Sequence, residues 1–175
     1  MRALKLTLLL VGNFAAMTLA GGQERYMETA EYLRAAFPNS EPTANTLWVT
    51  NELRQSAEDT LGYGIASLRV RYWRRDGRTA WILDETGKEQ PITVGVVVED
   101  DSASMVRVLE FRESRGWEVR YPFFTDQYND ARLNYRDEID RQIDSITGAT
   151  LSVNAVTRVV RLALFLYRHT GEANG

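Results

Sequence analysis

The stretch Asp144-Ser145-Ile146-Thr147-Gly148-Ala149-Thr150-Leu151-Ser152 joins a charged, aspartate-rich segment to the longest apolar helical run in the chain. Residues 151–169 predict one helix, in which the polar residues fall near a single stripe: Asn154, Arg158, Arg161 and Arg168. A polar stripe this narrow indicates a helix that is covered over most of its circumference. At ~1.5 Å per residue the helix is long enough to cross a whole domain. We expect a β-sheet to cover it, and the arginines argue against a transmembrane helix.

Strand signals precede this stretch and are separated by short polar turns. Asp76-Gly77, between two such runs, is a strong hairpin signal. The expected strands are 68–73, 79–83, 92–99 and 105–112, with a short alternating segment at 117–120. Consecutive strands joined by tight turns indicate an antiparallel meander. The predicted fold class is therefore α+β: an antiparallel β-meander packed against a long C-terminal helix, with one or two N-terminal helices.

The segment 21–61 is expected to be mainly helical. A first helix, predicted over 24–37 and ended by a proline, presents one apolar face that consists of Tyr26, Ala30, Leu33 and Phe37. A polar connector at 39–45 and a short strand at 47–49 follow. A second helix is predicted to begin at a Thr50 or Asn51 cap and to end at residue 61. Whether this segment belongs to the main domain, 62–175, or docks onto a partner stays open.

Several side chains can be assigned to core or surface from pattern alone. Aromatic residues in or near apolar runs are expected in the core, namely Tyr63, Trp73, Trp81, Phe123, Phe124 and Tyr128. Charged residues that alternate with them predict a solvated face, which would hold Arg69, Arg71, Arg74, Arg75 and Arg78. Residues 129–141 are expected to be a surface segment. His169 is expected at the surface, where it suits the C-terminal end of the helix dipole.

The first twenty residues predict a secretory signal peptide. A basic start at Met1–Lys5 precedes an apolar run that ends in Thr18-Leu19-Ala20. The run is shorter than the roughly 20 residues that a spanning helix needs, although an uncleaved N-terminal membrane anchor is the alternative. We therefore expect the mature protein to be periplasmic or otherwise extracytoplasmic.

Composition excludes several kinds of chemistry. The 175 residues include no cysteine, which excludes disulfides, thiolate metal sites and cysteine nucleophiles. The single histidine is too few for a His-rich metal site, so no metal site is predicted. A net charge of −3 gives no electrostatic case for nucleic-acid binding. Any redox or group-transfer chemistry is therefore expected to belong to a bound cofactor.

The opening stretch has the composition of a phosphate site. A helix that begins near Thr150 exposes its first N–H groups and the positive end of its dipole. Such an end stabilises a phosphate without needing a lysine. Gly148 and Ala149 allow close approach, and hydroxyls are available from Thr147, Thr150 and Ser152. The alternative is structural: Thr147 or Thr150 is an N-cap and nothing more.

A family resemblance bears on this choice. Residues 144–150 resemble the flavinylation motif Asp-x-x-Ser/Thr-Gly-Ala-Thr of the FMN-binding domain family, which includes peripheral subunits of the Rnf complex and of the sodium-pumping NADH:quinone oxidoreductase. Glu113-Ser114-Arg115-Gly116-Trp117-Glu118 is similar to the family segment Glu-Thr-Pro-Gly-Leu-Gly. Arg115 replaces the proline there, and the final glycine is absent. The resemblance covers roughly residues 62–169, so 62–175 is expected to be the FMN-binding domain.

The resemblance implies that a separate flavin transferase joins FMN to Thr150 through a phosphoester. The transferase would recognise Asp144, Thr147, Gly148, Ala149 and Thr150. The cofactor-binding set is then expected to be Thr147, Gly148, Ala149, Thr150, Leu151, Ser152, Glu113, Gly116 and Trp117. Trp117 would stack on the flavin or lie in the core, and Glu113 would hydrogen-bond the flavin or cap a turn.

The resemblance favours an exported electron-transfer flavoprotein. It would relay electrons between a membrane-bound donor and a redox partner, because the redox chemistry of such a protein belongs to its flavin. Two alternatives stay open. One is a small extracytoplasmic flavin-dependent reductase, which would need a substrate site beside the flavin. The other is a non-catalytic exported binding module, in which Thr150 is a plain N-cap.

Overall fold

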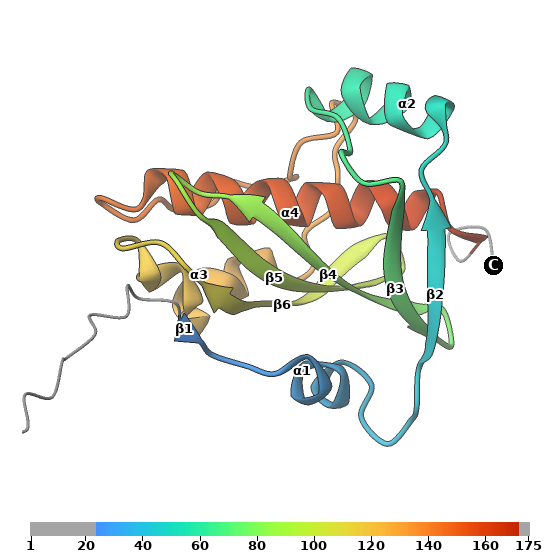
Figure 1. Cartoon of the computed structure of the whole chain (residues 1–175), viewed down its shortest axis with the longest axis horizontal. Coiled ribbons are helices and arrows are strands. Elements are labelled where there is room, and N and C mark those ends of the chain that lie inside the picture. The colour runs from blue at the N-terminus through green and yellow to red at the C-terminus, as the bar shows by residue number, and fades with distance from the viewer. Residues whose placement is uncertain (1–23, 172–175) are drawn as a thin grey trace, which may run out of the picture.

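The structure is a computed structural model that describes residues 24–171. Within this range the chain forms a six-stranded antiparallel sheet, in the order β1-β6-β5-β4-β3-β2 (Figure 1). The strands are β1 (Glu24–Arg25), β2 (Thr43–Trp48), β3 (Arg69–Arg75), β4 (Arg78–Thr86), β5 (Pro91–Glu99) and β6 (Ser102–Phe111). Strands β3 to β6 follow one another as hairpins, so the predicted meander is confirmed. The first hairpin turns at Asp76 and Gly77, both with positive φ, as a tight two-residue turn requires.

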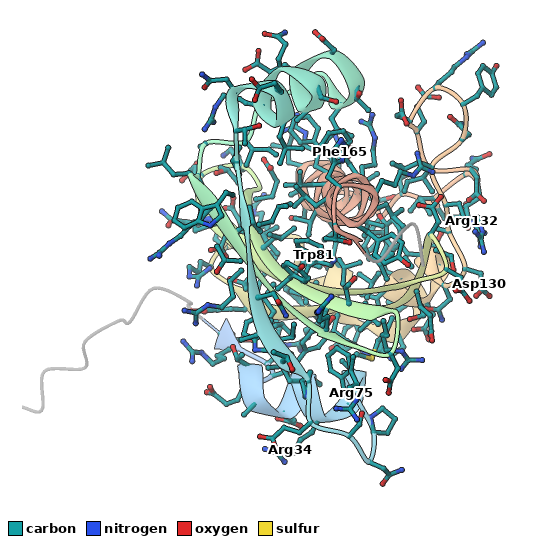
Figure 2. The ribbon with its side chains drawn as sticks, turned by 90° about the vertical axis from the view of Figure 1, so that its right-hand side faces the viewer. Arg34, Arg75, Trp81, Asp130, Arg132 and Phe165 are labelled. Atoms are coloured by element: carbon teal, nitrogen blue, oxygen red, sulfur yellow. The ribbon has the colours of Figure 1, made fainter. Side chains whose placement is uncertain are left out.

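The helices cover both faces of this sheet. They are α1 (Thr29–Ala36), α2 (Asn51–Leu61), the short α3 (Pro122–Thr125) and α4 (Thr150–Arg168), with 3₁₀ turns η1 (Trp117–Arg120) and η2 (Asp126–Tyr128). Figure 2 shows α4 and α2 on one side of the sheet and α1 on the other. The long C-terminal helix packs on β4, β5 and β6, so the predicted α+β class is confirmed.

The larger core lies between α4 and the sheet. Trp81 lies between them, fully buried, and its ring stacks on Tyr72 with centroids 4.7 Å apart (Figure 2). The α4 face toward the sheet is apolar, and the expected polar stripe contains exposed Asn154 and Arg158. By length and composition α4 could span a membrane, but most of it is buried in the fold. Burial of this kind is typical of the core helix of a globular domain.

A smaller core lies on the other face, beneath α1. Tyr32, Ala36 and Phe37 pack there against the sheet. The ring of Tyr32 lies directly over Gly95, where an added Cβ would be 2.5 Å from the Tyr32 Cζ. Because both faces are covered, five consecutive residues of β5, Val94 to Val98, are buried.

The N-terminal segment, residues 24–61, forms two strands as well as two helices. The helix predicted over 24–37 begins only at Thr29, because Glu24 and Arg25 pair with β6 as the edge strand β1. Consequently Ala30 is exposed and Tyr32 is the buried residue. Residues 43–45, predicted as connector, belong to β2 and pair with β3. Residues 24–61 therefore supply both edges of the sheet, and α2 packs against α4.

The structure confirms the predicted bounds of the second helix, α2. Thr50 is the N-cap, and its hydroxyl accepts a hydrogen bond from the Leu53 N–H at 3.2 Å. Gly62 ends the helix with a φ of 80°. The signal peptide predicted for residues 1–20 lies outside the described residues.

Two predictions after β6 are wrong. The alternating segment 117–120 is the 3₁₀ turn η1 and not a strand. Its N-cap, Gly116, has a φ of 86°, which turns the chain away from β6. Phe123 is 63% exposed, whereas Phe124 and Tyr128 are fully buried as expected. Residues 129–141 lie mainly at the surface, although Ala131 and Leu133 are buried.

Candidate functional site

Helix α4 begins with a tight turn. The Ala149 N–H donates to the Ile146 carbonyl at 2.9 Å, and Gly148 has a φ of 82° inside this turn. A left-handed residue at this position is what a type II turn requires, and glycine supplies it without strain. Ile146 packs against the main core and so fixes the turn to the fold. The positive φ of Gly148 therefore directs the chain into the first turn of α4.

The N-terminus of α4 has no side-chain cap among residues 24–171. Its N-cap is Ala149, whose carbonyl accepts the first helical bond, from the Val153 N–H at 2.9 Å. Neither Thr147 nor Thr150 is the cap, so the purely structural alternative for these threonines is wrong. The first-turn N–H groups have no intrahelical partner, and they carry the positive end of the dipole of a 19-residue helix.

A pocket of about 560 Å³ opens at this end of the helix. Six of the predicted site residues line it, and three more residues join them; the lining is Lys88, Glu113, Ser114, Arg115, Gly148, Ala149, Thr150, Leu151 and Ser152. Its volume falls in the range of small-molecule sites, about 300–1,000 Å³. Thr150 is exposed and Ser152 is buried, so the Thr150 side chain is the one accessible to another protein.

The other motif residues lie outside this lining. Thr147 and Asp144 are both exposed, and the Asp144 N–H donates to Gln127 Oε1 at 2.7 Å. Of the predicted recognition residues, Asp144, Thr147 and Gly148 thus lie on an accessible loop just ahead of Thr150, whereas Ala149 is buried.

Gly116 brings the Glu113 segment against the start of α4. A Cβ at this position would clash with Ser152 Oγ and would lie 3.3 Å from the Ala149 Cβ. Only a residue without a side chain fits there, and its φ of 86° also favours glycine. The two sequence segments that resemble the family motifs are therefore in direct contact.

Glu113 is a structural acceptor within the site. Its Oε1 accepts hydrogen bonds from the backbone N–H groups of Lys88, Glu89 and Gln90, the last two at 2.6 and 2.9 Å. Burial raises the pKa of this carboxyl, but the three N–H donors outweigh burial and hold the pKa below its ordinary value. Of the two predicted roles, the described residues show the turn cap. Glu113 thereby holds the β4–β5 turn over the pocket.

Two cations outside the predicted cofactor-binding set lie at this pocket. Lys88 reaches it because Glu113 holds the β4–β5 turn in place. Arg115 occupies the position where the family has proline, and it has no ion pair or side-chain hydrogen bond in the part of the chain that the structure describes. Arg115 could have been found from the sequence, as a basic residue inside a motif. Lys88 is far from both motifs along the chain.

A second pocket, of about 440 Å³, shares Glu113 and Ser114 with the first. Trp117 lines it and is 42% exposed, so it is a pocket wall and not a core residue. The guanidinium of Arg120 lies over three aromatic rings, at 4.4 Å from the Tyr26 centroid, 5.0 Å from Trp117 and 4.8 Å from Tyr121. This is a typical cation–π arrangement.

The combined donor set fits a phosphorylated aromatic molecule. Helix N–H groups and two cations suit the phosphate, and the neighbouring aromatic pocket suits a planar ring. Within the described range, no group of three or more His, Asp or Glu side chains could hold a metal ion.

The chemistry of these two adjoining pockets suits a cofactor that carries both a phosphate and a planar ring. Residues 87–164 match the family model described as the FMN-binding domain, so the chain contains an FMN-binding domain of that family and is a flavin-binding protein. The matched segment runs from the β4–β5 turn into α4 and includes both motifs. A search of curated proteins found no match.

Proposed function

We propose that the protein is an exported electron carrier that holds FMN through a phosphoester at Thr150. The observation that carries this proposal is the exposed Thr150 hydroxyl at an uncapped helix N-terminus, on the wall of a cation-bearing pocket inside the matched domain. The flavin supplies the electron-transfer chemistry when it is bound.

The chain's own residues have distinct parts in this proposal. The first-turn N–H groups of α4, with Lys88 and Arg115, neutralise the phosphate. Glu113 orders the turn that bears Lys88. Asp144, Thr147 and Gly148 form the exposed loop that a flavin transferase recognises.

The attachment requires an activated flavin phosphate, such as the anhydride of a flavin dinucleotide. The Thr150 oxygen forms the new P–O bond and gives its proton to a base of the transferase. The anhydride P–O bond breaks, and the nucleoside monophosphate leaves. A covalent link has a physical advantage outside the cell, because a dissociable flavin would be lost by dilution.

Loading by a flavin transferase tests the attachment. The full chain is co-expressed with the transferase, denatured and examined for in-gel flavin fluorescence. We expect wild type and Thr150→Ser to be fluorescent, since both keep a hydroxyl, and Thr150→Ala to be dark. Thr147→Ala is the matched control, because it removes a neighbouring exposed hydroxyl; it is expected to keep a covalent flavin, at reduced yield. Fluorescent Thr150→Ala would refute the attachment site.

Export and electron relay have their own tests. Cell fractionation with N-terminal sequencing is expected to find a mature chain that starts near residue 21 outside the cytoplasm. A chain that retains Met1 in the membrane fraction would show that the segment is an anchor and is not cleaved.

Electron relay is tested with loaded protein. Once reduced, it is expected to be reoxidised by membranes of its own host and not to turn over small organic acceptors. Steady turnover of such acceptors would favour a reductase.

A further inference from the structure

The pocket beside Trp117 has walls that a phosphate at Thr150 does not use. Tyr26, Phe111, Trp117 and Arg120 line it together with Glu24. It adjoins the phosphate pocket through Glu113 and Ser114, and Gly116 joins Trp117 to the first turn of α4. A ribityl chain that starts at the phosphate pocket can therefore lead into it.

Tyr26 is held in this pocket by the sheet. Its N–H donates to the Leu109 carbonyl of β6 at 2.8 Å, directly after the β1–β6 pairing. Tyr26 lies outside the segment that matches the family model, so this wall is supplied by the N-terminal part of the chain.

Arg120 brings charge to the same pocket. Its Nη1 donates to Glu24 Oε2 at 3.2 Å and its Nη2 to the Tyr121 hydroxyl at 3.0 Å. Glu24 is exposed, so the ion pair is screened by water and offsets the arginine charge only in part. A planar guanidinium that is surrounded by aromatic rings can hydrogen-bond the carbonyl edge of another ring.

We propose that this pocket receives the isoalloxazine ring of the FMN on Thr150, and that Arg120 positions the carbonyl edge of the ring and favours its reduced form. The inference rests on the proposed function. Reduction by a two-electron donor adds two electrons and one proton to the ring, which then carries a negative charge at its N1–C2 carbonyl edge. Arg120 stays protonated throughout, and no bond to the protein forms or breaks.

A competing groove of about 370 Å³ lies on the other side of Thr150. It is lined by Ile139, Ile143, Val153, Thr157, Arg161 and their neighbours, with no aromatic side chain among its described lining residues. Both arginines in its lining donate to backbone carbonyls: Arg161 Nε to Asp137 at 2.9 Å, and Arg141 to Asn129 and Asp130, each at 2.8 Å. The Arg120 pocket offers aromatic walls and a cation together, which is why we assign the ring to it.

The reduction potential of the loaded protein tests this inference. Arg120→Gln, Arg120→Lys, Arg161→Gln and a control, Arg34→Gln, are loaded by the transferase and equilibrated with reference dyes. Arg34 lies on α1, across the sheet from α4, and its loss changes the net charge equally (Figure 2). Arg120→Gln is expected to lower the equilibrium constant for reduction about tenfold, or roughly 30 mV for a two-electron couple. Arg120→Lys is expected to restore part of the shift, and Arg34→Gln to show none.

Fluorescence gives a second measurement that does not depend on Arg120 variants folding. Trp117→Leu removes the aromatic wall, and the fluorescence of the attached flavin is expected to rise severalfold because a stacked indole quenches it. Unchanged fluorescence, or a potential shift in Arg161→Gln and not in Arg120→Gln, would overturn the ring assignment. If those results come from fully labelled protein, the proposed function still stands. If wild type takes up no covalent flavin, both fail.

Discussion

Gly116 sets the distance between the loop that carries Trp117 and the first turn of α4. Its backbone lies so close to Ser152 Oγ that no side chain fits between them. Gly62 offers a natural comparison. It has a similar φ, 80° against 86°, but among the described residues an added Cβ there would meet nothing within 4 Å.

Gly116→Ala is therefore expected to cost more stability than Gly62→Ala. Left-handed strain alone costs about 1–2 kcal/mol for a non-glycine residue. Gly116→Ala adds an overpacking cost of about 1–3 kcal/mol. Urea unfolding of the two variants measures the difference. Equal losses would show that Ser152 is free to move away and that the close approach is not required. Adding Ser152→Ala to Gly116→Ala is expected to recover part of the loss.

How far the site could be predicted from the sequence differs from residue to residue. That Gly148 and Thr150 lie at the start of a helix could be predicted, because a helix start and a motif coincide along the chain. For Glu113 the sequence left two roles open, since the partners that show the turn cap are backbone groups 23 to 25 positions away. The cation Lys88 was missed for the same reason, because contacts across the sheet leave no periodic signal.

At the scale of elements, the β4–β5 turn depends on one carboxylate. Glu113 accepts three N–H groups there, and its pKa lies below its ordinary value. A lowered folded-state pKa stabilises the fold fully above the unfolded pKa, and this contribution is lost as the pH falls through the folded pKa.

Glu113→Gln is expected to lower the free energy of unfolding by about 1–2 kcal/mol at neutral pH, because the charged acceptor is lost. The difference from wild type should shrink as the pH falls below about 4, since wild type then loses the same charge. Thermal unfolding across pH measures this. The control is Glu89→Gln, whose exposed side chain pairs only with Lys88 in the described residues. A gap between wild type and Glu113→Gln that is independent of pH would contradict the assignment.

Helices and turns were predicted correctly where the local sequence signal was strong. The Asp76-Gly77 turn, the Thr50 cap and the narrow polar stripe of α4 each carry a local physical reason. The misses have reasons too. Residues 43–45, of which Thr43 and Asn45 are polar, belong to an edge strand with no buried residue, so the period-two signal is weak. Residues 117–120 alternate like a strand, but Val119 alone is buried in that turn.

At the scale of the whole molecule, the matched domain is smaller than the folded unit. The family match covers 87–164, whereas residues 24–61 supply β1, β2, α1 and α2. Without them both outer strands of the sheet are lost and the α1 face, with Val97 and Leu109, is uncovered. Uncovered edges and apolar faces favour aggregation.

A chain of residues 62–175 is therefore expected not to fold cooperatively, whereas a chain of residues 24–175 is expected to fold. Circular dichroism with thermal unfolding compares the two. A sharp transition for 62–175 would show that the N-terminal segment is a separable appendage. Retention of flavin loading in that shorter chain would also argue against Tyr26 as a wall of the ring pocket.

The most direct test of covalent attachment is peptide mapping of the transferase-loaded protein. Trypsin is expected to release residues 142–158, which contain Thr150 together with Ser145, Thr147, Ser152 and Thr157. Fragment-ion spectra locate the added mass within this peptide. We predict one FMN phosphoester, on Thr150. An FMN on Thr147 or Ser152, or an unmodified peptide from cells in which a known target is labelled, would contradict it.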